Sequence, residues 1–189
     1  MEIFDTVAPK TIWFFSDPHY DHVSLVSGSA NHPEPARGRF RTADEMGEFM
    51  VEQHNALVRP RDHYYCLGDF SMDVKALARW APRLHGHGRI ILGNHDLAKA
   101  QLYLQFFKKV MAYREFDGML FSHIPIAPWS MRWRANVHGH CHEAKPLFYE
   151  VSDPDLVGFG RRVRYINISM ERIHYRPVSL EQISKWSRA

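Results

Sequence analysis

The sequence predicts an α/β protein in which strands alternate with helices along most of the chain. Short runs rich in aromatic and β-branched residues are separated by longer stretches of helical periodicity, as in a parallel sheet covered by helices. Asp, Asn and His follow the predicted strands, at the carboxyl ends where open α/β sheets bind ligands. The 189 residues, 45% of them hydrophobic, fit a single domain spanning residues 1–189.

The first predicted elements are a strand and a helix separated by a long loop. Thr11–Ser16 is rich in aromatic residues and stops at an Asp-Pro pair, as a buried strand entering a loop does. Ser24–Arg41 contains Gly, Pro and three Arg, and we expect a surface loop there. Thr42 and Glu45 form a capping-box pattern before apolar residues that share one helical face, which predicts a helix over Ala43–Val58.

The rest of the chain continues this alternation and ends in further strands. The expected elements are a strand at His63–Leu67, a helix at Val74–Leu84, a strand at Arg89–Leu92, a helix at Leu97–Val110, strands at Gly118–Ser122 and Asn136–His138, a loop at Glu143–Gly160, strands at Val163–Ile168 and His174–Pro177, and a helix at Leu180–Trp186. We expect the later strands to form a second sheet.

Composition favours a cytoplasmic protein that does not enter a membrane. Met1–Lys10 carries Glu2 and Asp5 where a secretory signal would be basic, and no apolar run approaches the ~18 residues of a membrane span. Two cysteines, Cys66 and Cys141, are too few for a disulfide framework, and we expect Cys66 in the core. The net charge of +3 favours anionic partners only slightly.

Five short polar motifs follow predicted strands. They are Asp17-Pro18-His19, Gly68-Asp69, Gly93-Asn94-His95-Asp96, His123 and Gly139-His140-Cys141-His142. Residues two apart in an extended segment point the same way, so each His-containing pair at this spacing can reach one ion. Taken singly, each motif also fits a turn, a helix N-cap or a hydrogen-bonded strand end. Their occurrence in series, each at a strand end, favours a metal site.

The third motif also supplies candidate catalytic groups. Asn94 offers an amide oxygen, His95 an acid or base, and Asp96 a carboxylate that can orient the imidazole. An extended segment would turn Cys141 away from its neighbours, and an oxygen and nitrogen site needs no thiolate, so we exclude it as a ligand. We interpret His138 as structural.

In this order the five motifs resemble those of the calcineurin-like metallophosphoesterases. The likeness spans Ile12 to His142, and the tail Tyr175–Leu180 looks like the small single-domain bacterial and phage members. It implies a four-layer αββα sandwich of two mixed β-sheets flanked by helices. It also implies two metals that share Asp69. One would be held by Asp17, His19, Asp69 and His142, and the other by Asp69, Asn94, His123 and His140.

The resemblance implies hydrolysis of phosphate esters, with phosphodiesters expected first. Two divalent ions about 3.5–4 Å apart can share a hydroxide, the expected nucleophile, and hold the phosphate oxygens. His95 would protonate the leaving oxygen, which typically contributes ~10²–10⁴-fold, while Asp96 holds its ring. The donor set favours manganese first and accepts iron, zinc, nickel or cobalt. Candidate substrate contacts are His22, Arg37, Arg39 and Arg132.

Two other functions fit parts of the pattern. A nuclease or nucleotide-end phosphoesterase is favoured by Trp129 and Trp133 beside Arg132 and Arg134, an aromatic and basic stretch suited to stacking bases. Nuclease relatives usually carry an extra domain, for which we expect no room after the tail, so this function ranks second. A catalytically silent binding scaffold would lack His95 or several ligands, and none is missing.

Overall fold

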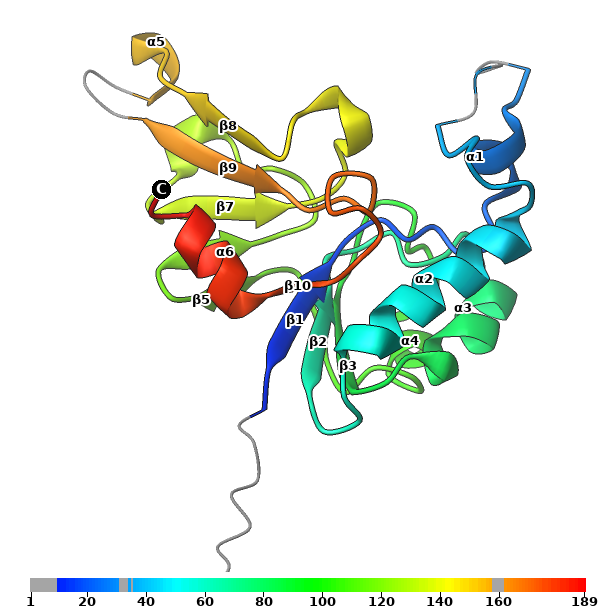
Figure 1. Ribbon diagram of the computed structural model, residues 1–189. Helices are drawn as coiled ribbons and strands as arrows, with labels where there is room; N and C mark the ends of the chain where they lie inside the picture. The colour runs from blue at the N-terminus through cyan, green and yellow to red at the C-terminus, as the bar shows by residue number, and fades with distance from the viewer. Residues whose placement is uncertain (1–9, 31–33, 35, 158–161) are drawn as a thin grey trace, which may run out of the picture.

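The computed structural model describes residues 10–30, 34, 36–157 and 162–189. Within these ranges two mixed β-sheets pack face to face, and helices cover the outer face of the first sheet (Figure 1). This arrangement confirms the predicted α/β sandwich of two mixed sheets. Residues 1–9, over which we predict no secretory signal, lie outside the described part, as do residues 31–33, 35 and 158–161 of the two predicted loops.

The first sheet has the strand order β10-β1-β2-β3-β4, and β10 runs antiparallel to β1 while the other pairs are parallel. Its strands are β1 (Ile12–Phe15), β2 (His63–Cys66), β3 (His87–Ile91), β4 (Val110–Met111) and β10 (Val178–Ser179). The helices of this half are α1 (Val23–Ser27), α2 (Ala43–Leu57), α3 (Val74–Trp80) with the short η1 (Ala81–Arg83), and α4 (Ala100–Tyr103). Because these strands are parallel and in register, the carboxyl ends of β1, β2 and β3 lie at the same edge of the sheet.

The second sheet has the order β5-β6-β7-β9-β8, with a parallel centre and antiparallel pairs at both edges. Its strands are β5 (Arg114–Phe116), β6 (Met119–Phe121), β7 (Ala135–His138), β8 (Phe148–Val151) and β9 (Val163–Asn167), accompanied by η2 (Pro128–Ser130), η3 (His142–Ala144), α5 (Pro154–Val157) and α6 (Leu180–Trp186). The segment around η2 lies on this sheet, because the Ile126 carbonyl accepts the Tyr165 hydroxyl at 2.6 Å.

Aromatic side chains fill the space between the two sheets. Phe14 of β1 stacks on Phe121 of β6 with ring centroids 4.4 Å apart, and on Tyr65 of β2 at 5.3 Å. On the opposite face of the first sheet, Tyr64 contacts the ring of His54 from α2. Each fully buried Phe contributes about 1.5–3 kcal/mol. This packing fixes the ends of β1, β2 and β6 relative to one another.

The predicted helix over Leu97–Val110 is wrong over most of its length. Only α4 is α-helical there, and the chain then turns and becomes extended. The Lys108 N–H donates to the Gly88 carbonyl at 2.8 Å, and β4 follows as a parallel neighbour of β3. Sheet pairing therefore overrides the helical periodicity at the end of this segment.

The predicted strand His174–Pro177 is also wrong, because its first two residues have φ values of 52° and 59° and form a turn. Pairing with β1 starts at Val178 instead. The two predicted loops contain regular structure within their described parts: α1 overlaps Ser24–Arg41, and β8 lies inside Glu143–Gly160. β5 was not predicted.

Helix capping follows the sequence in part. The Thr42 hydroxyl accepts the Glu45 N–H at 3.0 Å, as predicted, but the Glu45 carboxylate accepts the Arg41 N–H and does not complete the box. A complete capping box occurs at α6, between Ser179 and Gln182. None of the helices in the described ranges combines the length and apolar character needed to cross a membrane.

Candidate metal centre

The predicted ligands converge where the strands of both sheets end. Asp17 and His19 follow β1, Asp69 follows β2, Asn94 follows β3, His123 follows β6, and His140 and His142 follow β7. Backbone hydrogen bonds join these loops directly: the Asp17 N–H donates to the Gly68 carbonyl and the His19 N–H to the Asp69 carbonyl, both at 3.0 Å. The first two ligand loops therefore form one unit.

Five of these ligands have a left-handed backbone. Asp17, His19, Asp69, His140 and His142 have φ values between 43° and 64°. This region is uncommon for residues other than glycine, and each such residue costs about 1–3 kcal/mol. The cost is concentrated at the point where the side chains meet, which indicates a functional site.

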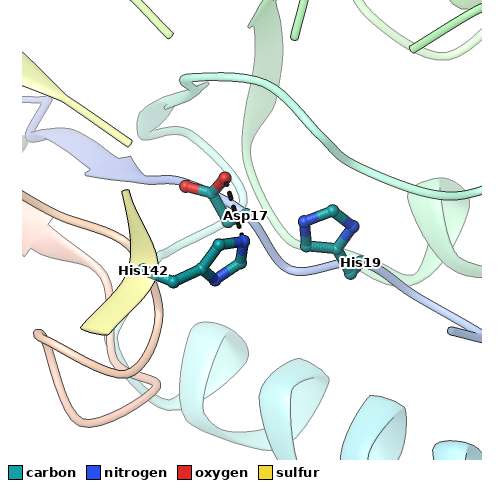
Figure 2. A group of neighbouring side chains, drawn as sticks. All are labelled: Asp17, His19 and His142. Carbon is teal, nitrogen blue, oxygen red and sulfur yellow. Dashed lines mark ion pairs between the residues drawn. The ribbon is translucent and has the colours of Figure 1, made fainter. Parts of the chain in front are cut away.

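One group, which we call site A, comprises Asp17, His19 and His142. Their ligand atoms lie within 4.8 Å of one another, and Figure 2 shows the two imidazoles beside the carboxylate. His142 Nε2 is 3.8 Å from Asp17 Oδ1. Burial raises the pKa of Asp17, and a bound cation would counteract this shift by favouring the ionised carboxylate. Burial also holds the pKa of His19 well below its usual value, which leaves that ring neutral.

The other group, site B, comprises Asp69, His123 and His140, with ligand atoms again within 4.8 Å of one another. Asn94 joins this group, since its Oδ1 lies 2.9 Å from His123 Nε2. Asp69 and His123 are buried, whereas His140 and Asn94 are exposed. Site B is therefore open to solvent on one side.

Asp69 lies between the two sites. Its Oδ2 is 3.6 Å from His19 Nε2 and 3.3 Å from His123 Nε2, and its Oδ1 accepts the His95 N–H at 2.8 Å. Burial acts to raise the pKa of Asp69, but the hydrogen bond and charge of His123 bring it down to about 2. A single ionised carboxylate thus faces ligands of both groups.

The donor chemistry around His123 fits a cation. Its Nδ1 lies 2.8 Å from the Leu67 carbonyl, which only accepts, so Nδ1 carries the hydrogen and the neutral ring directs its Nε2 lone pair toward Asp69. A lone pair and a carboxylate oxygen at 3.3 Å need a proton or a metal between them. Burial acts to lower the pKa of His123, but the nearby Asp69 carboxylate raises it overall. The surroundings of His123 Nε2 therefore favour a positive charge.

Two glycines leave room for the ligand carboxylates. A Cβ on Gly139 would overlap the Asp17 carboxylate and the Ser16 side chain, and a Cβ on Gly93 would overlap the Asp69 carboxylate. Neither glycine has a positive φ. Glycine is required at these positions by close approach rather than by backbone conformation.

His95 and Asp96, the predicted catalytic pair, lie beside the ligands but do not act on each other as predicted. The half-buried His95 ring is 5.3 Å from the His19 ring, at the border of site A. The Asp96 carboxylate accepts the backbone N–H groups of Asp69 at 2.7 Å and Gly93 at 2.8 Å. Asp96 therefore holds two loops in place rather than the His95 ring, and burial raises its pKa to about 6.

The four predicted substrate contacts separate into different environments. The half-buried His22 ring lies 5.3 Å from the His19 ring, beside site A. Arg37 is only 1% exposed, which corrects its expected role as a substrate contact. Arg39 is exposed and lies over the Tyr175 ring, while Arg132 is exposed over the Trp133 ring.

Sequence reasoning missed Glu171, which contacts a predicted ligand. Its Oε1 lies 3.1 Å from His142 Nδ1 and 2.7 Å from Arg37 Nε. Burial acts to raise the pKa of Glu171, but the contacts with His142 and Arg37 hold it well below its usual range. Glu171 belongs to no motif and lies in the turn after β9, so only its position in space identifies it.

The side chains that we excluded as metal ligands belong to neither site A nor site B. The buried His138 contacts the Gly139 carbonyl at 2.7 Å through Nδ1 and the Tyr149 hydroxyl at 2.9 Å through Nε2. Cys141 is half-buried and free, and Cys66 is free and fully buried in the core, as predicted.

Comparisons with known proteins bear on the fold. No protein-family model matches the sequence. The chain is 28% identical over 180 residues to the uncharacterized protein MJ1445 of Methanocaldococcus jannaschii, over 93% of this chain and 90% of that protein. Its structure is similar to that of the protein of unknown function AQ665 from Aquifex aeolicus, with a TM-score of 0.65 and 22% identity over 94% of this chain and 100% of the other.

A more distant structure is the nuclease MPE of Pseudomonas putida, with a TM-score of 0.47 and 16% identity over 83% of this chain and 74% of that one. The likeness to AQ665 shows a shared fold. The activity has to be argued from the site itself.

Proposed function

We propose that this chain is a dinuclear metal-dependent phosphoesterase. The observation that carries the proposal is the pair of ligand groups, site A and site B, which share the Asp69 carboxylate between them. Paired metal sites of this kind serve phosphatases and nucleases. The order of the five motifs, which resembles that of the calcineurin-like metallophosphoesterases, supports the same function.

We propose manganese as the preferred metal, with iron, zinc, nickel or cobalt as substitutes, because the donors are imidazole, carboxylate and amide without thiolate. The residues that would hold the two ions are Asp17, His19, Asp69 and His142 for one, and Asp69, Asn94, His123 and His140 for the other. When bound, such ions polarise phosphate oxygens and lower the pKa of water.

The chain's own side chains would supply proton transfer and positioning. Attack of water at phosphorus places negative charge on the leaving oxygen, and His95 at the border of site A would protonate it. The hydrogen bond from the His95 N–H to Asp69 Oδ1 fixes the backbone of this residue beside the shared carboxylate. Asp96 contributes indirectly, since it holds the backbone of both the Asp69 and the Gly93 loops.

The test is hydrolysis of bis(p-nitrophenyl) phosphate and p-nitrophenyl phosphate by metal-stripped protein reloaded with manganese. We expect turnover only after reloading, with the diester preferred. His95→Ala should lower kcat by ~10²-fold or more while both ions remain bound. The matched control is His87→Ala, which removes an exposed imidazole at the opposite end of β3. Full activity in His95→Ala would contradict the assigned role, and turnover without metal would contradict the mechanism.

A nucleic-acid end is the second candidate substrate, favoured by one feature of the surface. Trp129 is 68% exposed in η2, and the exposed Arg132 follows it three positions later in the sequence, so a base would have an exposed aromatic side chain to stack on. A short single-stranded oligonucleotide as a third substrate in the same assay separates the two. A strong decline of binding with salt would favour the polyanion, and equal KM values at low and high salt would favour a small ester.

A further inference from the structure

A buried ion pair lies behind site A. Arg37 Nε and Glu171 Oε1 are 2.7 Å apart, and the two side chains are 0% and 4% exposed. Desolvating both charges opposes their attraction, so a buried pair of this kind is weak evidence for stability. The role of the pair is therefore better inferred from its contacts with neighbouring groups.

Both partners of the pair reach the ligand loops of site A. Arg37 Nη2 donates to the Asp17 carbonyl at 2.5 Å and Nη1 to the Pro18 carbonyl at 2.6 Å. Glu171 Oε1 contacts His142 Nδ1 at 3.1 Å. The pair thus connects the loop that carries two ligands of site A with the side chain of the third.

The contact with Glu171 determines which nitrogen of His142 is free. An ionised carboxylate only accepts hydrogen bonds, so Nδ1 of a neutral His142 must carry the hydrogen. Nε2 then presents its lone pair, and it is this atom that lies 3.8 Å from Asp17 Oδ1. Metal-bound histidines commonly have such a carboxylate partner on the second nitrogen.

We propose that Glu171, held by Arg37, is the positioning residue of site A, and that it fixes the tautomer and orientation of His142 for metal binding. The inference rests on the proposed function only in requiring that site A bind a metal. Arg37 also acts directly on the first ligand motif, because its guanidinium binds the Asp17 and Pro18 carbonyls between the two ligands Asp17 and His19. Glu171 does not contact substrate.

The first experiment measures metal binding and not activity. Metal-stripped wild type, Glu171→Gln and Glu171→Ala are titrated with Mn²⁺ by calorimetry, and bound metal is counted by mass spectrometry. Glu171→Gln keeps the shape of the side chain but loses its charge. We expect one of two equivalents to bind ~10–100-fold more weakly in Glu171→Ala and the other to be unchanged, with a smaller loss in Glu171→Gln, whose amide oxygen can still accept the Nδ1–H of His142.

The matched control is Glu150→Gln, which removes a carboxylate that is paired with Arg164 on the second sheet, away from both sites. It should bind both equivalents as the wild type does. Wild-type affinity for both ions in Glu171→Ala would overturn the inference, whatever the activity. Two ions bound by a wild type that hydrolyses no ester would refute the proposed function and leave this inference standing.

A second measurement needs no variant at Glu171 to fold. Long-range ¹H–¹⁵N spectra of the metal-free wild type at alkaline pH report the tautomer of each neutral histidine, and the signal absent from His142→Gln belongs to His142. The Nδ1–H tautomer is the expected result. The Nε2–H tautomer would overturn the proposal.

Discussion

Sites A and B share one carboxylate, but their histidines are held in different ways. In site A, His142 is oriented by a side chain, Glu171, which is itself fixed by Arg37. In site B, His123 is oriented by the main chain, through the Leu67 carbonyl at the end of β2. His140 of site B is exposed, whereas Asp17 and His19 of site A are buried.

This difference shows two routes to the same result. A backbone carbonyl at a strand end is present as soon as the sheet forms, so His123 is oriented by the fold itself. A carboxylate held by a distant arginine depends on side chains that a single substitution can remove. We therefore expect site A to be the more easily lost by mutation.

The largest expected effect separates the shared ligand from an unshared one. Asp69→Asn should weaken the binding of both metal equivalents on the order of 10²-fold or more. Loss of a residue that only hydrogen-bonds to a metal ligand already costs ~10–100-fold in affinity, and loss of a ligand itself should cost at least as much. Asp17→Asn should weaken only the equivalent of site A. The measurement is bound manganese per chain after dialysis against a series of free-metal concentrations.

Two results would break this comparison. Equal loss of both ions in Asp17→Asn would mean that the sites form one cooperative unit. Retention of one ion at full affinity in Asp69→Asn would mean that this carboxylate belongs to a single site.

A smaller effect is expected from the glycines that make room for the carboxylates. A Cβ on Gly139 overlaps Asp17, and a Cβ on Gly93 overlaps Asp69. Each alanine variant should destabilise the protein by about 1–3 kcal/mol through overpacking. Gly139→Ala should weaken site A alone, whereas Gly93→Ala should weaken both sites.

Urea unfolding gives the stability of these variants, and metal titration gives the two affinities. Gly38→Ala is the control, because this glycine is exposed and its φ is not positive. A Gly139→Ala protein with an unchanged site A would show that the Asp17 loop adjusts to the added methyl group.

The sequence was sufficient to predict the ligand set because that set follows the strands. Parallel strands end at one edge of a sheet, so polar residues placed after successive strands meet in space. Glu171 could not be found in this way, since its partner Arg37 lies 134 positions away and no local pattern links them. A loop that contains three arginines also predicts exposed side chains, whereas Arg37 is buried.

Several of the elements that were mispredicted have a structure that depends on a distant partner. β4 and β10 have two residues each, too few for any periodicity, and they exist because β3 and β1 offer free edges. The helical periodicity of Leu97–Val110 is present in the sequence, but the end of this segment pairs with β3 instead of continuing the helix. The long amphipathic helix α2 depends on its own sequence and was predicted within a residue.

The smallest expected effect concerns acid unfolding, which has to be separated from acid release of metal before sites A and B are compared at low pH. His54 of α2 is 1% exposed; its Nε2 contacts the His85 carbonyl at 2.9 Å, and its Nδ1 has no hydrogen-bond partner among the described residues. Burial lowers its pKa from 6.5 to about 4. The unfolded chain therefore takes up this proton first, and stability present above pH 6.5 is lost as the pH falls toward 4.

His54 should thus contribute about 1 kcal/mol to the decline in unfolding free energy between pH about 7.5 and about 5.5. In His54→Gln, which keeps a donor for the His85 carbonyl but does not titrate, that part of the decline should disappear. Urea unfolding of both metal-free proteins across this range measures the difference, and parallel curves would show that His54 takes up its proton equally well in the folded protein. If the curves diverge as expected, His54→Gln is the background in which acid release of metal from site A and site B is measured with this part of the acid destabilisation removed.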